Sequence, residues 1–248
     1  MHNPLYRKSV KFVKLSPEET EWIVFWSRNY SKFLEHRVFF DSYKLFFHFT
    51  LVSFHHLLEK QHISPTVVGK QAEILSNTYG GDHIIWRYDP IIFWQDGDNV
   101  ISNFNGAEFS EYCRLFSALG VKRCYFSFAT HYPKFIKRFH AKYPSLCVIE
   151  PDTSCVQQTI EIMKNHAVNY GVELFSCCNN NLIDDIILPG SCISGTLLNG
   201  LSGNRDVSVA KSPTRKDCGC TRSIDIGDYV NQPCYFGCIY CYANPVWK

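Results

Sequence analysis

The C-terminal end of the chain concentrates residues that could bind a metal. Residues 218–248 hold five of the chain's twelve cysteines. Three of these, Cys234, Cys238 and Cys241, are spaced C-x3-C-x2-C, with Tyr240 directly before the third. Three thiolates on one short loop can ligate three irons of a [4Fe-4S] cluster and leave the fourth iron open. The spacing therefore predicts a metal centre with a free coordination position, at which a reaction could occur.

The spacing separates this loop from the ferredoxin type. A ferredoxin run, C-x2-C-x2-C-x3-C-P, supplies four closely spaced thiolates, whereas no cysteine follows Cys241. Residues 233–241, PCYFGCIYC, instead resemble the cluster loop of radical S-adenosylmethionine enzymes. Gly237 suits such a turn because glycine adopts left-handed backbone angles at little cost. Two alternatives stay open, a zinc knuckle that also uses Cys218 and Cys220, and unrelated free thiols.

The overall composition is that of a globular protein. Of the 248 residues, 46% are hydrophobic and 19% are charged, which suits one large α/β domain with a buried core. A formal net charge of +2 gives no strong signal for nucleic acid or for a membrane surface. Residues 134–142 carry several Lys and Arg side chains, and we interpret this basic run as a solvated helix face.

The chain shows neither a signal peptide nor an apolar run long enough to span a membrane. We therefore expect a cytoplasmic protein without a membrane partner. In a reducing compartment twelve cysteines are not expected to form a disulfide framework, and clustered cysteines more often bind metal or do chemistry.

Strands and helices that alternate along the chain must position these residues. Apolar β-branched and aromatic runs predict strands over residues 10–14, 22–26, 45–51, 84–89, 122–128 and 172–176. Residues 16–19, SPEE, resemble a helix start with acidic residues in its first turn. Helical spacing and capping residues predict helices from Pro65 to Gly80, over residues 106–119, after Pro133, and from a cap at Thr153 or Ser154 to Gly171.

Such alternation is typical of parallel βαβ units in one sheet. Five or six units are too few for a complete eight-stranded barrel, so the pattern predicts an α/β fold with a partial or permuted (β/α) barrel-like sheet over residues 1–190. Residues 191–248 would form a cysteine-rich iron-sulfur-binding segment packed on it. Chemistry gathers at the carboxyl ends of strands in such folds. The residues expected there are Arg28, Thr50, Arg87, Asp89, Ser127 and Cys177.

Eight motifs along the chain resemble an uncharacterised family of unknown function whose C-terminus carries a radical-SAM-like cysteine cluster. They are VFWSRN (24–29), HFTL (48–51), IIWRYDPIIF (84–93), ELFSC (173–177), SCISG (191–195), CGC (218–220), SIDIGDY (223–229) and CYFGCIYCYAN (234–244). Relatives in this family begin with a further stretch containing Ser-Arg-Arg-Thr-Asp before the Asn-Pro that stands here as residues 3–4. We therefore expect one strand of the barrel to be missing. Because only seven residues follow Cys241, the strands that hold a nucleotide must precede the loop.

Four further thiols stand at positions that match this family. Cys177, Cys192, Cys218 and Cys220 would suffice for a closed second site that holds either zinc or a second cluster. In the alternative, Cys177 and Cys192 are small buried hydrophobes and only the other pair binds metal. The remaining cysteines with an assignment, at positions 113, 124, 147 and 155, are expected to be structural.

Arg87 and Asp89 follow a buried strand and could hold the carboxylate and ribose of S-adenosylmethionine, with Tyr240 of the loop beside the cofactor. The alternative is a buried Arg–Asp pair that stabilises the sheet. Asp225 could orient the loop or cap a turn, and His48 and the other histidines show no ligand spacing.

Two functions from different classes follow. One is a radical-SAM-like enzyme with an unknown substrate and an electron donor as partner. The other is a non-catalytic zinc or iron-sulfur protein used for binding or redox relay.

Overall fold

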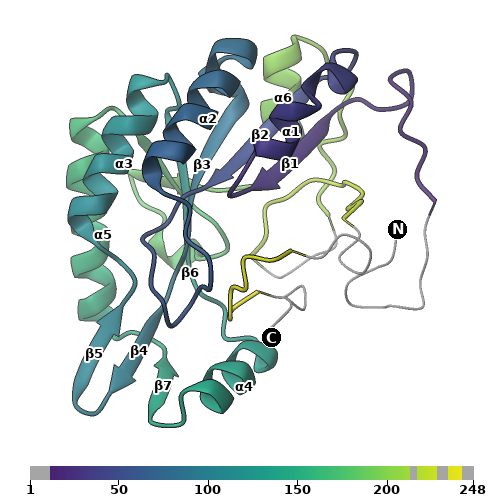
Figure 1. Cartoon of the computed structure of the whole chain (residues 1–248). Helices are drawn as coiled ribbons and strands as arrows, with labels where there is room; N and C mark the ends of the chain where they lie inside the picture. The colour runs from purple at the N-terminus through teal and green to yellow at the C-terminus, as the bar shows by residue number, and fades with distance from the viewer. Residues whose placement is uncertain (1–11, 213–216, 228–233, 242–248) are drawn as a thin grey trace.

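The computed structural model describes residues 12–212, 217–227 and 234–241 (Figure 1). The chain folds as a mixed α/β structure around a six-stranded sheet whose neighbouring strands all run parallel, in the order β1-β2-β3-β6-β8-β9. The strands are β1 (Ile23–Ser27), β2 (Leu45–Thr50), β3 (Ile84–Ile91), β6 (Arg123–Phe128), β8 (Glu173–Ser176) and β9 (Ile187–Pro189). Their spatial order follows the chain, as expected of successive βα units. Within the described residues the order ends at β1 and β9, so no closed barrel is seen.

Three long helices cover one face of this sheet (Figure 1). They are α2 (Pro65–Tyr79), α3 (Gly106–Ala118) and α5 (Thr153–Asn169). Each helix begins at a side chain that accepts a hydrogen bond from a free backbone N–H, namely Ser64, Asn105 and Asp152. The cap of α5 is thus Asp152 rather than the predicted Thr153 or Ser154, because its carboxylate accepts from Cys155 N at 2.7 Å.

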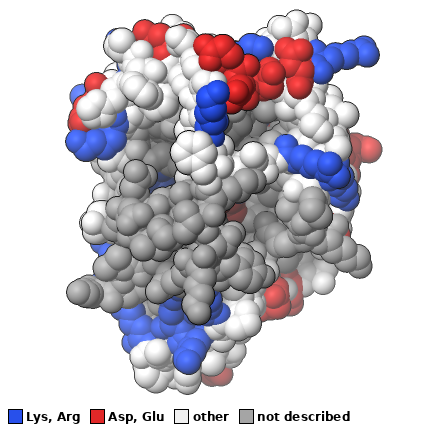
Figure 2. Space-filling view, turned by 90° about the vertical axis from the view of Figure 1, so that its right-hand side faces the viewer, with Lys and Arg blue, Asp and Glu red and all other residues white. Residues whose placement is uncertain are grey.

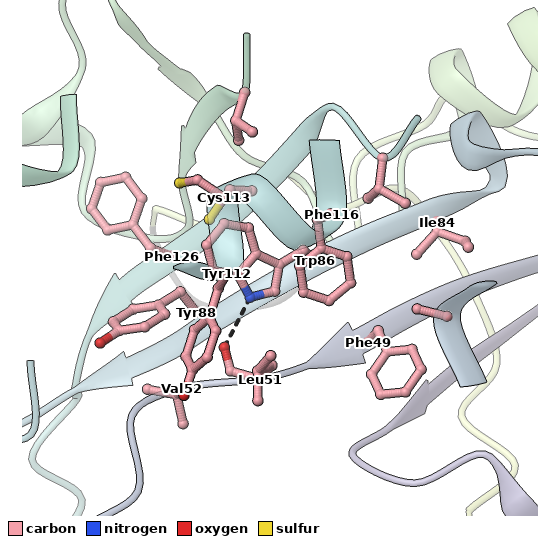
Figure 3. Packing of buried hydrophobic residues seen from close by; sticks show 14 of the residues in the cluster. Phe49, Leu51, Val52, Ile84, Trp86, Tyr88, Tyr112, Cys113, Phe116 and Phe126 are labelled. Carbon is pink, nitrogen blue, oxygen red and sulfur yellow. Dashed lines mark hydrogen bonds between the residues drawn. The ribbon is translucent and has the colours of Figure 1, made fainter. Parts of the chain in front are cut away.

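The core under these helices is aromatic (Figure 3). Trp86 and Phe116 stack with ring centroids 5.1 Å apart, and Phe109 packs on both Trp86 and Tyr88. The Trp86 indole nitrogen donates to Leu51 O at 2.8 Å, which satisfies its buried N–H group. Full burial of such side chains stabilises the fold by roughly 2 kcal/mol each. The helix residues that pack on this core recur at helical spacing, which is why the sequence predicts these helices.

The opposite face of the sheet has different neighbours. Phe46, Ile85 and Tyr125 pack there against Leu198 of helix α6 (Gly195–Ser202). Side chains two residues apart on a strand point to the same face, so His48 and Arg87 also face this side. The second face therefore carries polar side chains and lies toward the cysteine-bearing C-terminal segments.

A small antiparallel sheet lies beyond the carboxyl ends of the main strands, with helix α4 (Pro133–Lys142) beside it (Figure 1). Its order is β5-β4-β7, from β5 (Asn99–Ser102), β4 (Phe93–Asp96) and β7 (Leu146–Ile149). Its own apolar cluster includes Ile92, Trp94, Phe135 and Phe139. None of these three strands was predicted from the sequence, because β4 follows β3 almost directly and pairs with β7, which is distant in the chain.

Short elements complete the described chain. They are α1 (Ser31–Glu35) and the 3-10 turns η1 (Arg37–Phe40), η2 (Gly81–His83) and η3 (Asn180–Leu182). Figure 2 shows Lys and Arg gathered at the end of the molecule where α4 lies. Lys134, Lys137 and Lys142 are exposed on that helix while Phe135 and Phe139 are buried, so the basic run lies on the outer face of an amphipathic helix.

Three predictions of secondary structure are wrong. Residues 12–14 form no strand, and residues 17–19 form a turn rather than a helix start, while Val10 and Lys11 lie outside the described residues. Strand β3 continues past Asp89 to Ile91. It does so because pairing with β6 shifts register between Tyr88 and Ile91, which accommodates Pro90 and the cis Asp89–Pro90 peptide without a ladder bond from the proline.

Within the described residues, no helix combines the length and apolarity needed to cross a membrane. The division of the chain after residue 190 stays a prediction.

Candidate metal-binding cysteines

The loop of residues 234–241 (the cluster loop) packs on the segment that follows β2. Ile239 is only 1% exposed and lies in the apolar cluster with Leu58 and Phe135. Ile239 N donates to Leu58 O at 2.8 Å, and the backbone N–H groups of Lys60 and Gln61 both donate to Phe236 O. The cluster loop is therefore held by backbone hydrogen bonds and by one buried side chain.

A buried polar network fixes the second half of the cluster loop. Both terminal nitrogens of Arg28 donate to the Glu59 carboxylate, at 2.8 and 2.5 Å. Arg28 also donates to the Tyr240 hydroxyl at 2.6 Å, and that hydroxyl in turn donates to Glu59. Burial alone would lower the pKa of Arg28, but the neighbouring acidic groups raise it, so the guanidinium stays charged. Arg28 follows β1 directly, so this network joins the cluster loop to the carboxyl end of a strand.

The three cysteines of the cluster loop differ in exposure. Cys234 is exposed, whereas Cys238 and Cys241 are half-buried. Burial raises the pKa of the Cys238 thiol to about 12, although Arg28 acts in the opposite direction. Cys241 N donates to Cys238 O at 3.1 Å, and Arg138 of α4 donates to Cys241 O at 2.6 Å. The positive charge near the Cys238 thiol is that of Arg28.

Gly237 allows the tight path of the cluster loop. Its φ is +61°, in the left-handed region that disfavours other residues. A Cβ atom at this position would also lie 2.9 Å from the Cδ and Cγ atoms of Lys60. The predicted left-handed backbone at Gly237 is confirmed, and the close approach of Lys60 is a second reason for glycine.

Away from the cluster loop, the structure brings together the other four predicted cysteines. The sulfurs of Cys177 and Cys192 lie 3.3 Å apart. Cys192 also contacts the Cys220 thiol, which in turn contacts that of Cys218. Cys177 follows β8, Cys192 lies between β9 and α6, and the other two belong to the CGC segment. Three segments that are distant in sequence therefore deliver one connected group of thiols.

Arg87 is the positive charge beside this group. Its Nη1 donates to the Cys192 sulfur at 2.8 Å, and its Nη2 donates to Asp89, which also accepts from Ser127. Hydrogen bonds from the Cys177 and Cys220 thiols, together with the Arg87 charge, hold the pKa of Cys192 well below its usual value against the effect of burial. Arg87 and Asp89 thus form the buried ion pair that the sequence analysis named as one alternative. The contact of these two residues with S-adenosylmethionine stays a prediction.

His48 lies against the same group from strand β2. Its Nε2 is 2.8 Å from Cys192 O, and its ring stacks on Trp26 with centroids 4.7 Å apart. Burial lowers the pKa of His48 to about 3, with a contribution from Arg87. His48 is therefore a neutral ring that holds the backbone of Cys192.

The remaining cysteines and Asp225 are placed as follows. Cys113 and Cys124 are buried in the core under the helices, Cys147 is exposed and Cys155 is intermediate. Asp225 accepts from Gly227 N at 2.9 Å, so it caps a turn as the commoner alternative predicted. Within the described part of the chain, no three or more His, Cys, Asp or Glu side chains are grouped so that they could hold a metal ion as they stand.

Sequence reasoning missed two participants. Glu59 gives no signal in HHLLEKQ (55–61), because its role depends on an arginine 31 positions away. Cys178 is adjacent to Cys177 and has a φ of +61°, which is unusual for a residue with a side chain. The pair of adjacent cysteines was visible in the sequence, but the strained backbone was not.

The comparisons with known proteins identify the family and nothing finer. No curated protein and no solved structure matches the chain. A family model matches residues 1–243, nearly the whole chain, which confirms the expected membership of an uncharacterised family. The protein therefore belongs to the family described as Domain of unknown function (DUF1848).

Proposed function

We propose that the protein is an iron-sulfur protein of the radical-SAM-like type. Cys234, Cys238 and Cys241 would ligate three irons of a [4Fe-4S] cluster and leave the fourth for S-adenosylmethionine. When bound, such a cluster supplies the reductive cleavage of that cosubstrate, with electrons from an external donor.

The observation that carries this proposal is the attachment of the cluster loop to the carboxyl end of β1 through Arg28, Glu59 and Tyr240. Ligands of parallel α/β sheets bind at that edge. The chemistry of the donor set also suits the cluster, since three soft thiol ligands lie on eight residues that turn at a left-handed glycine, and these thiols would converge as the cluster binds. The sequential strand order, with three helices on one face, supports the finer interpretation of a partial barrel.

The residues near Cys238 would help the cluster loop to bind the [4Fe-4S] cluster. Arg28 carries a fixed positive charge beside the Cys238 thiol, which favours its ionised form as a ligand. The Tyr240 ring and Ile239 bury one side of the cluster loop and keep water from it. Because Arg28 rather than Arg87 lies at the cluster loop, Arg28 is the cation that a carboxylate bound there would meet.

One observation favours a second candidate, a non-catalytic metal protein. The cavity lined by Arg28, Thr50 and Phe236 has a volume of only about 10 Å³, which suits one water molecule. Sites for drug-sized ligands measure roughly 300–1,000 Å³. A nucleotide would therefore need a larger rearrangement of this region than a metal site formed by the thiols alone.

Anaerobic reconstitution with iron and sulfide tests the proposal. We expect about four irons per chain bound at the cluster loop and a charge-transfer band at about 400 nm. Adding S-adenosylmethionine to the reduced protein should change its paramagnetic resonance spectrum and release 5′-deoxyadenosine. A full cluster with an unchanged spectrum and no product would leave the non-catalytic function. Failure to bind any iron would overturn the radical-SAM-like function, and colourless protein that contains zinc would favour the non-catalytic metal protein.

A further inference from the structure

We propose that Cys177, Cys192, Cys218 and Cys220 form a second, separate centre that binds one thiophilic divalent cation of the Zn²⁺ class. Its four thiolates would close the coordination shell, as in structural zinc sites. This inference does not rest on the function of the cluster loop, because the two sets of cysteines share no residue. The positive charge near Cys238 of the cluster loop is Arg28, whereas the one beside Cys192 is Arg87.

The sulfur spacing favours one metal ion over a cubane. Zinc–sulfur bonds of about 2.3 Å in a tetrahedron place the sulfurs about 3.8 Å apart. The Cys177 and Cys192 sulfurs lie 3.3 Å apart, and further sulfur contacts join Cys192 to Cys220 and Cys220 to Cys218. In a [4Fe-4S] cluster each thiolate binds a different iron, so its sulfurs must stand farther from one another. The four thiols form a chain of contacts and would have to turn toward one point as the metal binds.

The backbone around Cys192 packs closely against residues 218–221. Ile193 N donates to the Cys220 sulfur at 3.4 Å, a contact that stabilises a thiolate. The CGC segment pairs with the chain before α6, since Thr221 N donates to Ile193 O at 2.9 Å. A Cβ atom on Gly219 would lie 2.4 Å from the Ser191 hydroxyl oxygen. Any larger residue at this position would require the Ser191 side chain to rotate away, so glycine favours the close packing of residues 218–220 on the segment around Cys192.

The charge around the group suits a buried anionic centre. Four thiolates and one divalent cation leave a net charge of −2, which is costly to bury without compensation. Arg87, with 11% of its side chain exposed, donates to the Cys192 sulfur and is itself held by Asp89. Asp89 is in turn fixed by Ser127. Outer contacts of this kind orient metal ligands and tune their affinity.

Cys178 supplies an internal control. Its sulfur contacts that of Cys177, one of the four proposed ligands, and its left-handed backbone would relax on substitution by glycine. We therefore leave Cys178 outside the ligand set. If the assignment is right, Cys178→Gly retains the metal, whereas Cys177→Ser in the adjacent position loses it.

The test uses the full chain with Cys234, Cys238 and Cys241 all replaced by Ala, so that the cluster loop cannot hold iron. Elemental analysis after expression with zinc and iron should find about one zinc per chain and no acid-labile sulfide. Adding Cys177→Ser or Cys220→Ser should lower bound zinc about ten-fold or more, while adding Cys178→Gly should not. Circular dichroism establishes that each variant is folded.

The unsubstituted protein provides a second measurement should the triple variant not fold. Its zinc should appear in addition to any iron, and X-ray absorption at the zinc edge should report four sulfur neighbours at about 2.3 Å. Iron with an equal amount of sulfide in the triple variant would overturn the mononuclear site. So would zinc retained in Cys220→Ser, zinc lost in Cys178→Gly, absence of metal, or recovery of Cys177 and Cys192 as a disulfide from anaerobic protein.

Discussion

Arg28 and Glu59 form a two-bond ion pair across 31 positions of sequence, and the Tyr240 hydroxyl hydrogen-bonds to both partners. The Glu59 side chain is only 3% exposed and that of Arg28 is 17% exposed. The pair therefore joins three distant parts of the chain at the carboxyl end of β1. Its removal should affect both stability and the attachment of the cluster loop.

Replacing Glu59 by Gln leaves the Arg28 charge without its partner in a buried position. Breaking one side of a buried pair costs about 3 kcal/mol, so the urea midpoint should fall clearly and trypsin should cleave near Arg28 or Lys60 sooner. The exposed pair Lys32–Glu35 offers a control, since Glu35→Gln should leave the midpoint unchanged. Equal effects from the two substitutions would contradict the role given to Glu59.

Gly237→Ala tests the path of the cluster loop. The new Cβ would meet Lys60 at 2.9 Å and would stand on a φ of +61°. Gly97→Ala in the β4–β5 hairpin is the matched control, because its φ is +58° with nothing within 4 Å. Both should lose about 1 kcal/mol to backbone strain, but only Gly237→Ala should also reduce the iron bound after reconstitution. Iron loss in both variants would point to a general loss of folding instead.

Arg87→Met should destabilise the protein by about 3 kcal/mol, since Asp89 would be left partly buried without its cation. Adding Asp89→Asn removes that unpaired charge, so the double variant should regain part of the loss in a chemical unfolding experiment. Additive losses from the two substitutions would mean that the pair acts independently and does not stabilise the sheet.

The helical side of the fold was predictable because its signals are local. Pro65 and the glycines at 80 and 81 mark the ends of α2, and the Phe109, Cys113 and Phe116 spacing marks α3. The small sheet was missed because β4 follows β3 after one residue and pairs with β7, fifty positions later in the chain. Four-residue strands that depend on distant partners carry almost no periodicity of their own.

In the candidate site, too, features with a local sequence signal were predictable and features that depend on distant residues were not. Ligand spacing within the CGC segment and the cluster loop is visible in the sequence, and the structure brings Cys177 and Cys192 into contact as the motifs suggested. The cations beside the thiols were not predicted as such, since the sequence indicated Arg28 and Arg87 only as residues at strand ends. Its partnership with Glu59 and Tyr240 depends on how the cluster loop packs, which no local pattern encodes.

Cys241→Ser and Cys113→Ala should separate ligand cysteines from packing cysteines. Serine retains the backbone hydrogen bonds of Cys241, including the one its carbonyl accepts from Arg138, so the cluster loop should stay docked while its thiolate is lost. We expect reconstituted iron at the cluster loop to fall to near background, because no neighbouring thiol on the cluster loop can substitute.

Cys113 is fully buried in α3, where burial raises the pKa of its thiol to about 12. Its loss should cost about 1 kcal/mol of packing and leave the iron content unchanged. Iron analysis with unfolding curves on both variants decides the matter, and iron loss from both alike would refute the assignment of the cluster loop.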